Sequence, residues 1–254
     1  MCQKNIKLII EYKGTNFSGW QSQAGTKTIQ DEITDAIFKT TGKKVNLISA
    51  GRTDAGVHAL GQVANFIIEH SLETEKYREA LNYYLPEDII IKSSQEVSDK
   101  FHARFDAVSK RYRYLIGLAK SALYKDYRWE KYFELDFPLL KKAASLIIGE
   151  HDFMPFCVVS SRKESNICII ESSHWYKIGP LLIFEIRGNR FLHSMVRSLV
   201  GSMVNLALVG KDKNKQNLTL GKFKDIIQTP TAERVVFMAP AEGLYMVSVK
   251  YNKG

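Results

Sequence analysis

Cysteine is scarce in this sequence. Of its 254 residues only Cys2, Cys157 and Cys168 are cysteines, and none of them forms a Cys-x-x-Cys pair. An odd number of thiols without that spacing indicates neither a disulfide framework nor a thiolate metal site, and it suits a reducing cytoplasm. We therefore expect all three side chains to serve packing.

Long hydrophobic runs are also missing. No stretch approaches the length of a membrane span, and the N-terminus lacks a signal-peptide pattern, because Lys4 and Lys7 are followed by a strand-like segment. Low-complexity segments and close repeats are absent too. The content of 45% hydrophobic and 25% charged residues is typical of a globular protein. The length allows one large domain or two small ones, so we expect a cytoplasmic protein without a membrane partner.

Acidic residues are under-represented in one half of the chain. Residues 1–106 carry 13 Lys and Arg against 14 Asp and Glu, whereas residues 107–254 carry 23 against 13. The net charge of +9 therefore comes from the second half, which predicts a polyanionic partner held mainly there. A solvated lysine-rich surface is the alternative, and we expect one at residues 211–215.

Residues 49–66 contain the most informative stretch. Three glycines, at 51, 56 and 61, surround one carboxylate, Asp54, with Arg52 two residues before it and His58 four after. The flanking segments 45–50 and 62–69 are typical of strands. Asp54 is therefore expected on a glycine-rich loop, where backbone can approach a ligand closely. If the loop is extended, Arg52 points to the same side as Asp54 and favours its ionised form.

Composition alone leaves the role of Asp54 open. Thr-Asp-Ala-Gly is also good turn chemistry. A phosphate loop is excluded, because Val57 and His58 follow where Lys and Ser or Thr would be required. A metal site at Asp54 and His58 would need a third ligand nearby. A glycosidase would need a second carboxylate close to the first, and none is evident.

Hydrophobic periodicity predicts β-α-β-β-α-β in the first half, the order of a split βαβ unit. Its elements are a strand at 6–12, a loop at 13–25 anchored by Phe17 and Trp20, a helix capped by Thr28, a helix ended by Pro86 and a strand from Ile89. The second half is predicted to contain a strand at 108–118, a helix started by Asp136 and Pro138, a hairpin of 166–175 with 181–187, a helix at 189–209 and a strand at 244–251.

Two of these elements carry cations beside apolar residues. On strand 108–118, Lys110, Tyr112 and Tyr114 share one face while Arg111 and Arg113 share the other, an alternation that suits RNA. For Tyr114 a core position is the simpler interpretation. On helix 189–209, Arg190, His193 and Arg197 fall on one stripe. A cation on a mostly buried helix needs an anion, which could be Glu185 or Asp54.

Seven short blocks occur in order between about residue 6 and residue 251: EYKG at 11–14, GWQ at 19–21, GRTDAGVH at 51–58, FHARF at 101–105, KRYRY at 110–114, FLHSMVR at 191–197 and AEGLY at 241–245. Together they resemble the TruA family of tRNA pseudouridine synthases. The resemblance implies an α+β fold of two halves, 1–106 and 107–254. Each half would have a mainly antiparallel sheet flanked by helices, with the active-site cleft between the halves.

The resemblance also implies a function. A homodimer would clamp tRNA and isomerise uridine to pseudouridine at positions 38 to 40 of the anticodon arm, without a metal or cofactor. Asp54 would be the catalytic carboxylate, Tyr112 would stack on the uracil, Arg52 would fill the space that the base leaves, and Arg197 would pair with Asp54. Further contacts to RNA are expected from Phe101, His102, Arg104, Arg111 and Arg162.

Residues 160–166 depart from the family pattern. They lack its Pro-x-Arg-like, tRNA-contacting stretch and contain Glu164, which leaves the choice of substrate open. The alternatives are a pseudouridine synthase for other RNA positions and a non-catalytic RNA-binding protein.

Overall fold

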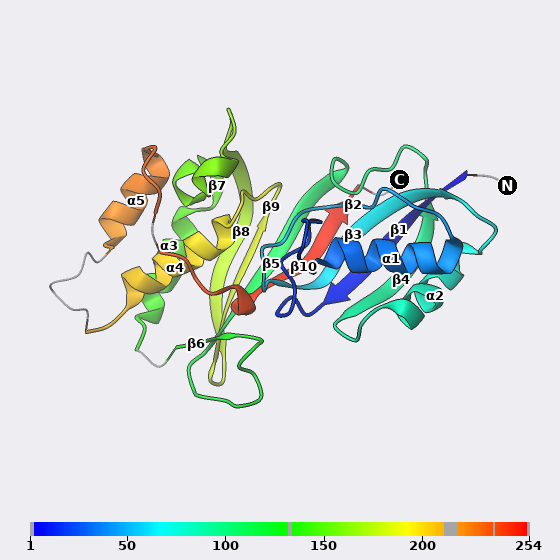
Figure 1. The fold of residues 1–254 in the computed structure, drawn as a ribbon. Coiled ribbons are helices and arrows are strands. Elements are labelled where there is room, and N and C mark those ends of the chain that lie inside the picture. The colour runs from blue at the N-terminus through cyan, green and yellow to red at the C-terminus, as the bar shows by residue number, and fades with distance from the viewer. Residues whose placement is uncertain (1–2, 132–133, 211–217, 236, 253–254) are drawn as a thin grey trace. The chain divides into compact units, whose positions relative to one another are not determined.

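A computed structural model describes residues 3–131, 134–210, 218–235 and 237–252 (Figure 1). The chain forms two compact units: unit 1 comprises Met1–Lys110 and Tyr245–Gly254, and unit 2 comprises Arg111–Leu244. The halves predicted from the sequence, 1–106 and 107–254, differ from these units chiefly in the last strand, which belongs to unit 1. Mixed α and β content with mostly antiparallel strand pairing agrees with the predicted fold class.

Unit 1 is built on a sheet of order β4–β1–β3–β10. β1 (Gln3–Tyr12) pairs antiparallel with both β3 (His58–Glu69) and β4 (Ile89–Val97). β10 (Leu244–Tyr251) joins β3 in parallel, with Tyr245 opposite His58. The predicted strand at 45–50 is only β2 (Ile48–Ser49), and β3 begins four residues before the predicted start at residue 62.

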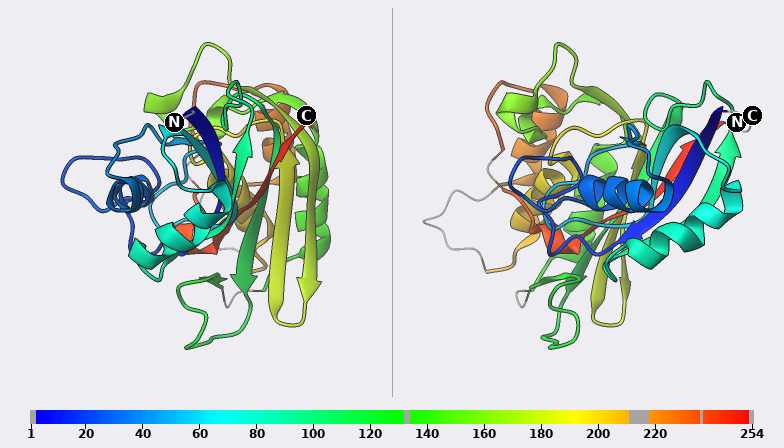
Figure 2. Two further views of the ribbon diagram at one scale, coloured as in Figure 1. Left: turned by 90° about the vertical axis from the view of Figure 1, so that its right-hand side faces the viewer. Right: turned by 45° about the vertical axis from the view of Figure 1, so that its right-hand side comes forward.

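Two helices lie on one face of this sheet (Figure 2). α1 (Ile29–Thr41) starts at Thr28, whose side chain accepts a hydrogen bond from the Asp31 amide, as predicted. α1 turns its apolar stripe of Ile29, Ile33, Ala36 and Ile37 into the core. α2 (Tyr77–Tyr84) follows the 3-10 turn η1 (Thr74–Lys76) and buries Tyr77 and Leu81.

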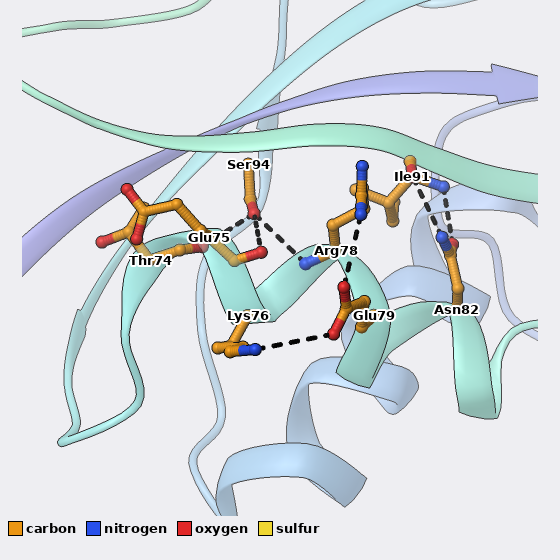
Figure 3. Close-up of polar contacts among 8 residues, drawn as sticks. All are labelled: Thr74, Glu75, Lys76, Arg78, Glu79, Asn82, Ile91 and Ser94. Atoms are coloured by element: carbon orange, nitrogen blue, oxygen red, sulfur yellow. Dashed lines mark hydrogen bonds and ion pairs between the residues drawn. The ribbon is translucent and has the colours of Figure 1, made fainter.

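Side chains fasten α2 to β4 (Figure 3). Ser94 Oγ donates to Thr74 O at 2.7 Å and accepts from Arg78 N at 3.1 Å. Asn82 Nδ2 donates to Ile91 O at 3.0 Å, and Ile91 N donates to Asn82 Oδ1 at 2.7 Å. Because β4 is the edge strand of unit 1, Asn82 supplies the partners that a neighbouring strand would otherwise provide.

Replacing Asn82 with alanine is expected to lower the free energy of unfolding by about 1–3 kcal/mol, because both backbone groups of Ile91 lose their partner. Denaturant unfolding measures this. The matched control on the same helix is Glu79→Ala, which removes only exposed ion pairs with Lys76 and Arg78 and should cost less than about 1 kcal/mol. Equal effects of the two substitutions would contradict the role given to Asn82.

Unit 2 contains strands in the order β5–β9–β8–β7. β5 (Ala107–Gly117) enters from unit 1, and β6 (Trp129–Glu130) pairs with it in parallel. β8 (Ile167–Ile178) and β9 (Leu181–Gly188) form the predicted hairpin, with Gly179 at φ +53° in its turn. β7 (Gly149–Asp152) pairs antiparallel with β8.

Three α-helices are described in unit 2: α3 (Phe137–Leu146), α4 (Met195–Ala207) and α5 (Leu220–Gln228). Asp136 caps α3 by accepting from Leu139 N, and Pro138 lies in its first turn, as predicted. Two 3-10 turns, η2 (Met154–Phe156) and η3 (Val159–Ser161), connect β7 to β8, and a third, η4 (Ala241–Gly243), precedes β10.

α4 is shorter than the predicted helix at 189–209. Asn189 Oδ1 accepts from the amides of Arg190 and Ile169 at 2.7 and 2.9 Å, so its side chain holds a non-helical backbone. Ser194 has φ +60°, and the helix begins after it. Arg190 and His193 therefore precede the helix, and the predicted stripe that they share with Arg197 is wrong.

Cys157 and Cys168 are buried, as expected for packing. Burial raises the pKa of the Cys168 thiol to about 12. Tyr114 is also buried and donates from its hydroxyl to Pro240 O, which confirms its core position. Cys2 and the expected lysine-rich surface at 211–215 lie outside the described residues. Within the described ranges, no helix has both the length and the apolar character needed to cross a membrane.

Candidate active site

The loop that carries Asp54 links β2 to β3. Val57 N donates to Asp54 O at 3.2 Å and closes a four-residue turn, in which Gly56 has φ +79°. Thr53 before the turn is buried, whereas Arg52 is exposed and Asp54 is partly exposed. The turn expected from Thr-Asp-Ala-Gly therefore exists, and it presents the carboxylate from a buried base.

Hydrogen bonds fasten that base to the sheet. Thr53 Oγ1 and Tyr12 OH are 2.8 Å apart, and Gln62 Nε2 donates to Gly51 O at 2.7 Å. Trp20 N donates to Thr53 O at 3.1 Å. Burial raises the pKa of the Tyr12 phenol to about 12, against the opposing effect of its hydrogen bonds with Thr53 and Gln62. Tyr12 therefore stays neutral near pH 7.

Glycines let the 13–28 loop pack directly against the Asp54 loop. A side chain at Gly14 would overlap the carbonyl of Val57, and one at Gly19 would lie 2.7 Å from Thr53 O. Gly19 also has φ +90°. Phe17 and Trp20, the predicted anchors of this loop, are buried. Close backbone packing of this kind restrains the position of Asp54.

His58 has a structural role in this arrangement. The residue is 1% exposed, and its Nδ1 accepts from Gly14 N at 3.1 Å. The ring stacks on Tyr245 of β10, with centroids 4.8 Å apart. His58 thus connects β3 to the 13–28 loop and to the last strand. Over the residues that the structure describes, no group of three or more His, Cys, Asp or Glu side chains is arranged to hold a metal.

Lys110 is a cation at this loop that the sequence did not single out. A side chain at Gly51 would lie 3.5 Å from Lys110 Nζ and from Met246 Cε, so the ammonium group is beside the loop that carries Asp54. Sequence reasoning placed Lys110 only on a strand face. Its position depends on how strands far apart in the sequence pair, for which no local signal exists.

Two predicted site residues, Tyr112 and Arg197, belong to unit 2. Tyr112 is 7% exposed, and its ring meets Phe191 edge-on at 5.0 Å. Arg197 Nε donates to Ala239 O at 2.9 Å. Asp54 and Arg52 belong to unit 1, so the predicted pairing of Arg197 with Asp54 crosses the two units and stays a prediction.

Glu185, the other anion considered for Arg197, pairs with Arg113. Arg113 Nη2 and Nε lie 2.6 and 2.7 Å from Glu185 Oε1. Burial alone would raise the pKa of Glu185. The hydrogen bond and charge of Arg113, with the nearby charge of Arg111, outweigh it and lower the pKa. The Glu185–Arg113 pair thus ties β9 to β5.

Arg162 lies in a group of cations in unit 2. Its Nη1 donates to Ala232 O at 2.6 Å, while its Nε and Nη2 are buried and have no hydrogen-bond partner among the described residues. The charges of Arg162, Arg190 and Arg234 all act on the Cys157 thiol, where they oppose the rise in pKa that burial causes. Only Arg162 of these three was predicted as an RNA contact.

The remaining residues predicted to contact RNA differ in how exposed they are and in what they pack against. Phe101 packs against Tyr251 at 5.0 Å, and Lys7 lies over its ring at 5.6 Å. His102 and Arg104 flank an exposed phenylalanine, Phe105, which sequence reasoning did not select. Arg111 is partly buried on β5, and its Nε has no hydrogen-bond partner within the described part of the chain.

The segment 160–166 that departs from the family pattern is locally ordered by Asn166. This buried residue accepts from Lys163 N at 3.0 Å and donates to Lys163 O at 2.8 Å. Ser161 Oγ lies 2.7 Å from His193 Nδ1. The segment therefore begins within η3, where Ser161 contacts His193, and continues as a loop that Asn166 closes.

A family model described as tRNA pseudouridine synthase matches residues 8–106 and 143–252. A protein of Acetivibrio thermocellus named tRNA pseudouridine synthase A is 44% identical over 98% of this chain and 100% of its own length. One of Thermoanaerobacter sp. (strain X514) with the same name is 40% identical, again over 98% of this chain and 100% of its own.

One solved structure, titled Crystal Structure of a Cbf5-Nop10-Gar1 Complex, is 12% identical, with a TM-score of 0.33 over 76% of this chain and 52% of that chain. A TM-score this low does not establish a shared fold. The family model and the relatives, by contrast, span both units and include the Asp54 loop. On that ground, the chain belongs to the tRNA pseudouridine synthase family.

Proposed function

We propose that this protein isomerises uridine to pseudouridine in the anticodon stem-loop of tRNA, at positions 38 to 40, with Asp54 as the catalytic carboxylate. The observation that carries the proposal is the match, over nearly the whole chain, to relatives named tRNA pseudouridine synthase A. The firm anchoring of the Asp54 loop supports it, because a catalytic group must be held in position.

The reaction rearranges one nucleotide without changing its composition. The bond between ribose C1′ and uracil N1 breaks, the uracil turns, and C1′ bonds to C5, while the proton lost from C5 is balanced by one gained at N1. This chemistry needs a carboxylate that attacks the sugar or the base, or takes a sugar proton, and then leaves again. Asp54 supplies that group, and the proposal assigns no metal or cofactor to the reaction.

A uridine in a stem must leave the base stack before it can react, at a cost of about a few kcal/mol. Arg52 is exposed two residues before Asp54 and is suited to occupy the space that the base leaves. Tyr112 is assigned to stack on the uracil. Arg197 is assigned to pair with Asp54, since an arginine keeps its charge at every relevant pH.

RNA binding is assigned mainly to the basic part of the chain, with 23 Lys and Arg against 13 Asp and Glu in residues 107–254. We expect the affinity for tRNA to fall at least about tenfold between 50 and 200 mM salt, as the release of two or more counterions requires. Arg162→Gln should reduce the slope of log K against log salt by about one. The control, Lys39→Gln on an exposed turn of α1, should leave that slope unchanged. A flat salt response of the wild type would contradict electrostatic binding.

The direct test is incubation of the purified protein with unmodified tRNA transcripts, followed by mapping of pseudouridine at each position. Modification at positions 38 to 40 supports the proposal. Modification elsewhere would identify a synthase for other RNA positions, and tight binding without modification would identify a non-catalytic RNA-binding protein.

The proposal also includes a homodimer and a cytoplasmic location. Light scattering of the protein with and without tRNA tests the dimer.

A further inference from the structure

Residues 101–106 form a turn on unit 1 that hydrogen bonds from polar side chains of unit 1 hold in place. Ala103 is buried, its amide donates to Asn65 Oδ1 at 2.9 Å, and its carbonyl accepts from Tyr251 OH at 2.7 Å. Asn5 Nδ2 donates to Phe101 O at 2.9 Å, and Asn65 Nδ2 donates to Asn5 Oδ1 at the same distance. A satisfied network of this kind makes the turn rigid.

Hydrogen bonds within the turn centre on His102. Its Nδ1 accepts from the amides of Arg104 and Phe105, both at 3.2 Å. Its own amide donates to Asp106 Oδ2 at 2.8 Å, and Asp106 N donates to His102 O at 3.1 Å. The one acid in the turn is therefore engaged by backbone, and the imidazole is fixed in orientation.

These bonds hold a group of aromatic and cationic side chains at the surface. The rings of His102 and Phe105 lie 4.3 Å apart with an interplanar angle of 30°, and the guanidinium of Arg104 is 5.8 Å from the Phe105 centroid. Phe105 is nevertheless 76% exposed. A single exposed phenylalanine needs no explanation. This one, however, has the tilted His102 ring against it and the Arg104 cation beside it, both on a rigid turn.

We propose that Phe105, supported by His102, is a stacking platform for one unstacked base of the bound tRNA, and that Arg104 contacts a neighbouring phosphate. This inference rests on the proposed function for the identity of the RNA. A flat ring beside a cation is complementary to a base joined to a phosphate, whereas a protein partner would be expected to present an apolar surface to Phe105. Sequence reasoning chose Phe101, whose ring packs against Tyr251.

If Phe105 is a stacking platform, replacing it should lower the affinity for tRNA. The loss should depend on whether an aromatic ring remains, and it should not change the salt dependence of binding. Phe105→Ala should weaken tRNA binding by about 5- to 150-fold, the range found when a base loses its aromatic partner. Phe105→Leu should lose most of this affinity and Phe105→Trp should retain it. The salt slope should stay unchanged in all three, because a ring releases no counterions, whereas Arg104→Gln should lower the slope by about one.

Tyr83→Ala is the matched control. Tyr83 is 82% exposed on α2 of the same unit, and its ring contacts Tyr84. Binding by this variant should be within about twofold of wild type. Fluorescence titration with a labelled tRNA transcript measures all variants, and circular dichroism checks that each one is folded.

Three outcomes would overturn the platform. They are equal binding by Phe105→Ala and Tyr83→Ala, full binding by Phe105→Leu, and a change in oligomeric mass of Phe105→Ala, which would show a protein interface. These outcomes are distinct from failure of the proposed function, which is wild-type protein that forms no pseudouridine. Binding by the wild type that is sensitive to Phe105 would support the platform even then.

Discussion

Asp54→Asn is expected to lower the rate of pseudouridine formation by about 10⁴-fold or more, the scale on which loss of a catalytic nucleophile is felt in enzymes. An amide has the shape of the carboxylate but carries no negative charge, so it can neither attack nor accept a proton efficiently. The fold should persist, because the turn closes through the backbone of Asp54 and Val57 and the loop is fastened by Thr53. Single-turnover assays with saturating enzyme measure the chemical step directly.

The binding of tRNA by Asp54→Asn should stay within about threefold of wild type, since binding is assigned to other residues. Thr53→Ser is a matched neighbour, because it keeps the hydroxyl that meets Tyr12 and should retain most activity. Mass spectrometry must show that the introduced amide has not hydrolysed to the acid. Turnover by Asp54→Asn within tenfold of wild type would mean that Asp54 serves only the turn.

Local signals in the sequence predicted much of the fold. Thr28 and Asp136 cap helices where their side chains satisfy the first amides, and Gly179 turns the β8–β9 hairpin. Each of these features is decided by neighbours in the chain, so a short window contains the information. The Asp54 loop could also be predicted from a short stretch of sequence, because the glycines around Asp54 indicate a loop.

Features that depend on distant residues were missed. The predicted helix start at residue 189 was wrong because the Asn189 side chain bonds the amide of Ile169 twenty residues earlier, and α4 begins only after Ser194. The hydrophobic periodicity of the sequence continues through residue 189, because it reflects the spacing of apolar residues and carries no information about a hydrogen bond to a distant residue. The last strand joins unit 1 because Tyr245 pairs with His58, a residue far from it in the sequence.

The FHARF motif contains two phenylalanines, Phe101 and Phe105, and the sequence alone does not show which of them is exposed to RNA. Both phenylalanines flank His102-Ala103-Arg104, and nothing local separates them. The sheet separates them, because Tyr251 comes from β10 to pack on Phe101 and leaves Phe105 at the surface. The partial burial of Phe101 by a strand nearly 150 residues away can only be known from the fold.

Gly19→Ala is expected to damage both stability and activity, and Gly25→Ala only stability. Both glycines lie in the 13–28 loop with positive φ, +90° and +75°, so each alanine should cost about 1–2 kcal/mol from the left-handed backbone alone. At Gly25 nothing lies within 4 Å of the added carbon, whereas at Gly19 it would lie 2.7 Å from Thr53 O. The difference between the variants therefore isolates the contact with the catalytic loop.

At Gly19 the methyl group must push away the backbone next to Asp54, because Trp20 N also bonds Thr53 O at 3.1 Å and ties the two loops together. A shift of about 1 Å at a catalytic group can reduce the rate by about 10²-fold. We therefore expect kcat to fall by about that factor in Gly19→Ala, with an unfolding free energy about 2–4 kcal/mol below wild type. Gly25→Ala should keep kcat within about twofold. Assays well below both melting temperatures separate the rate effect from unfolding, and equal kcat values for the two variants would show that the 13–28 loop does not position Asp54.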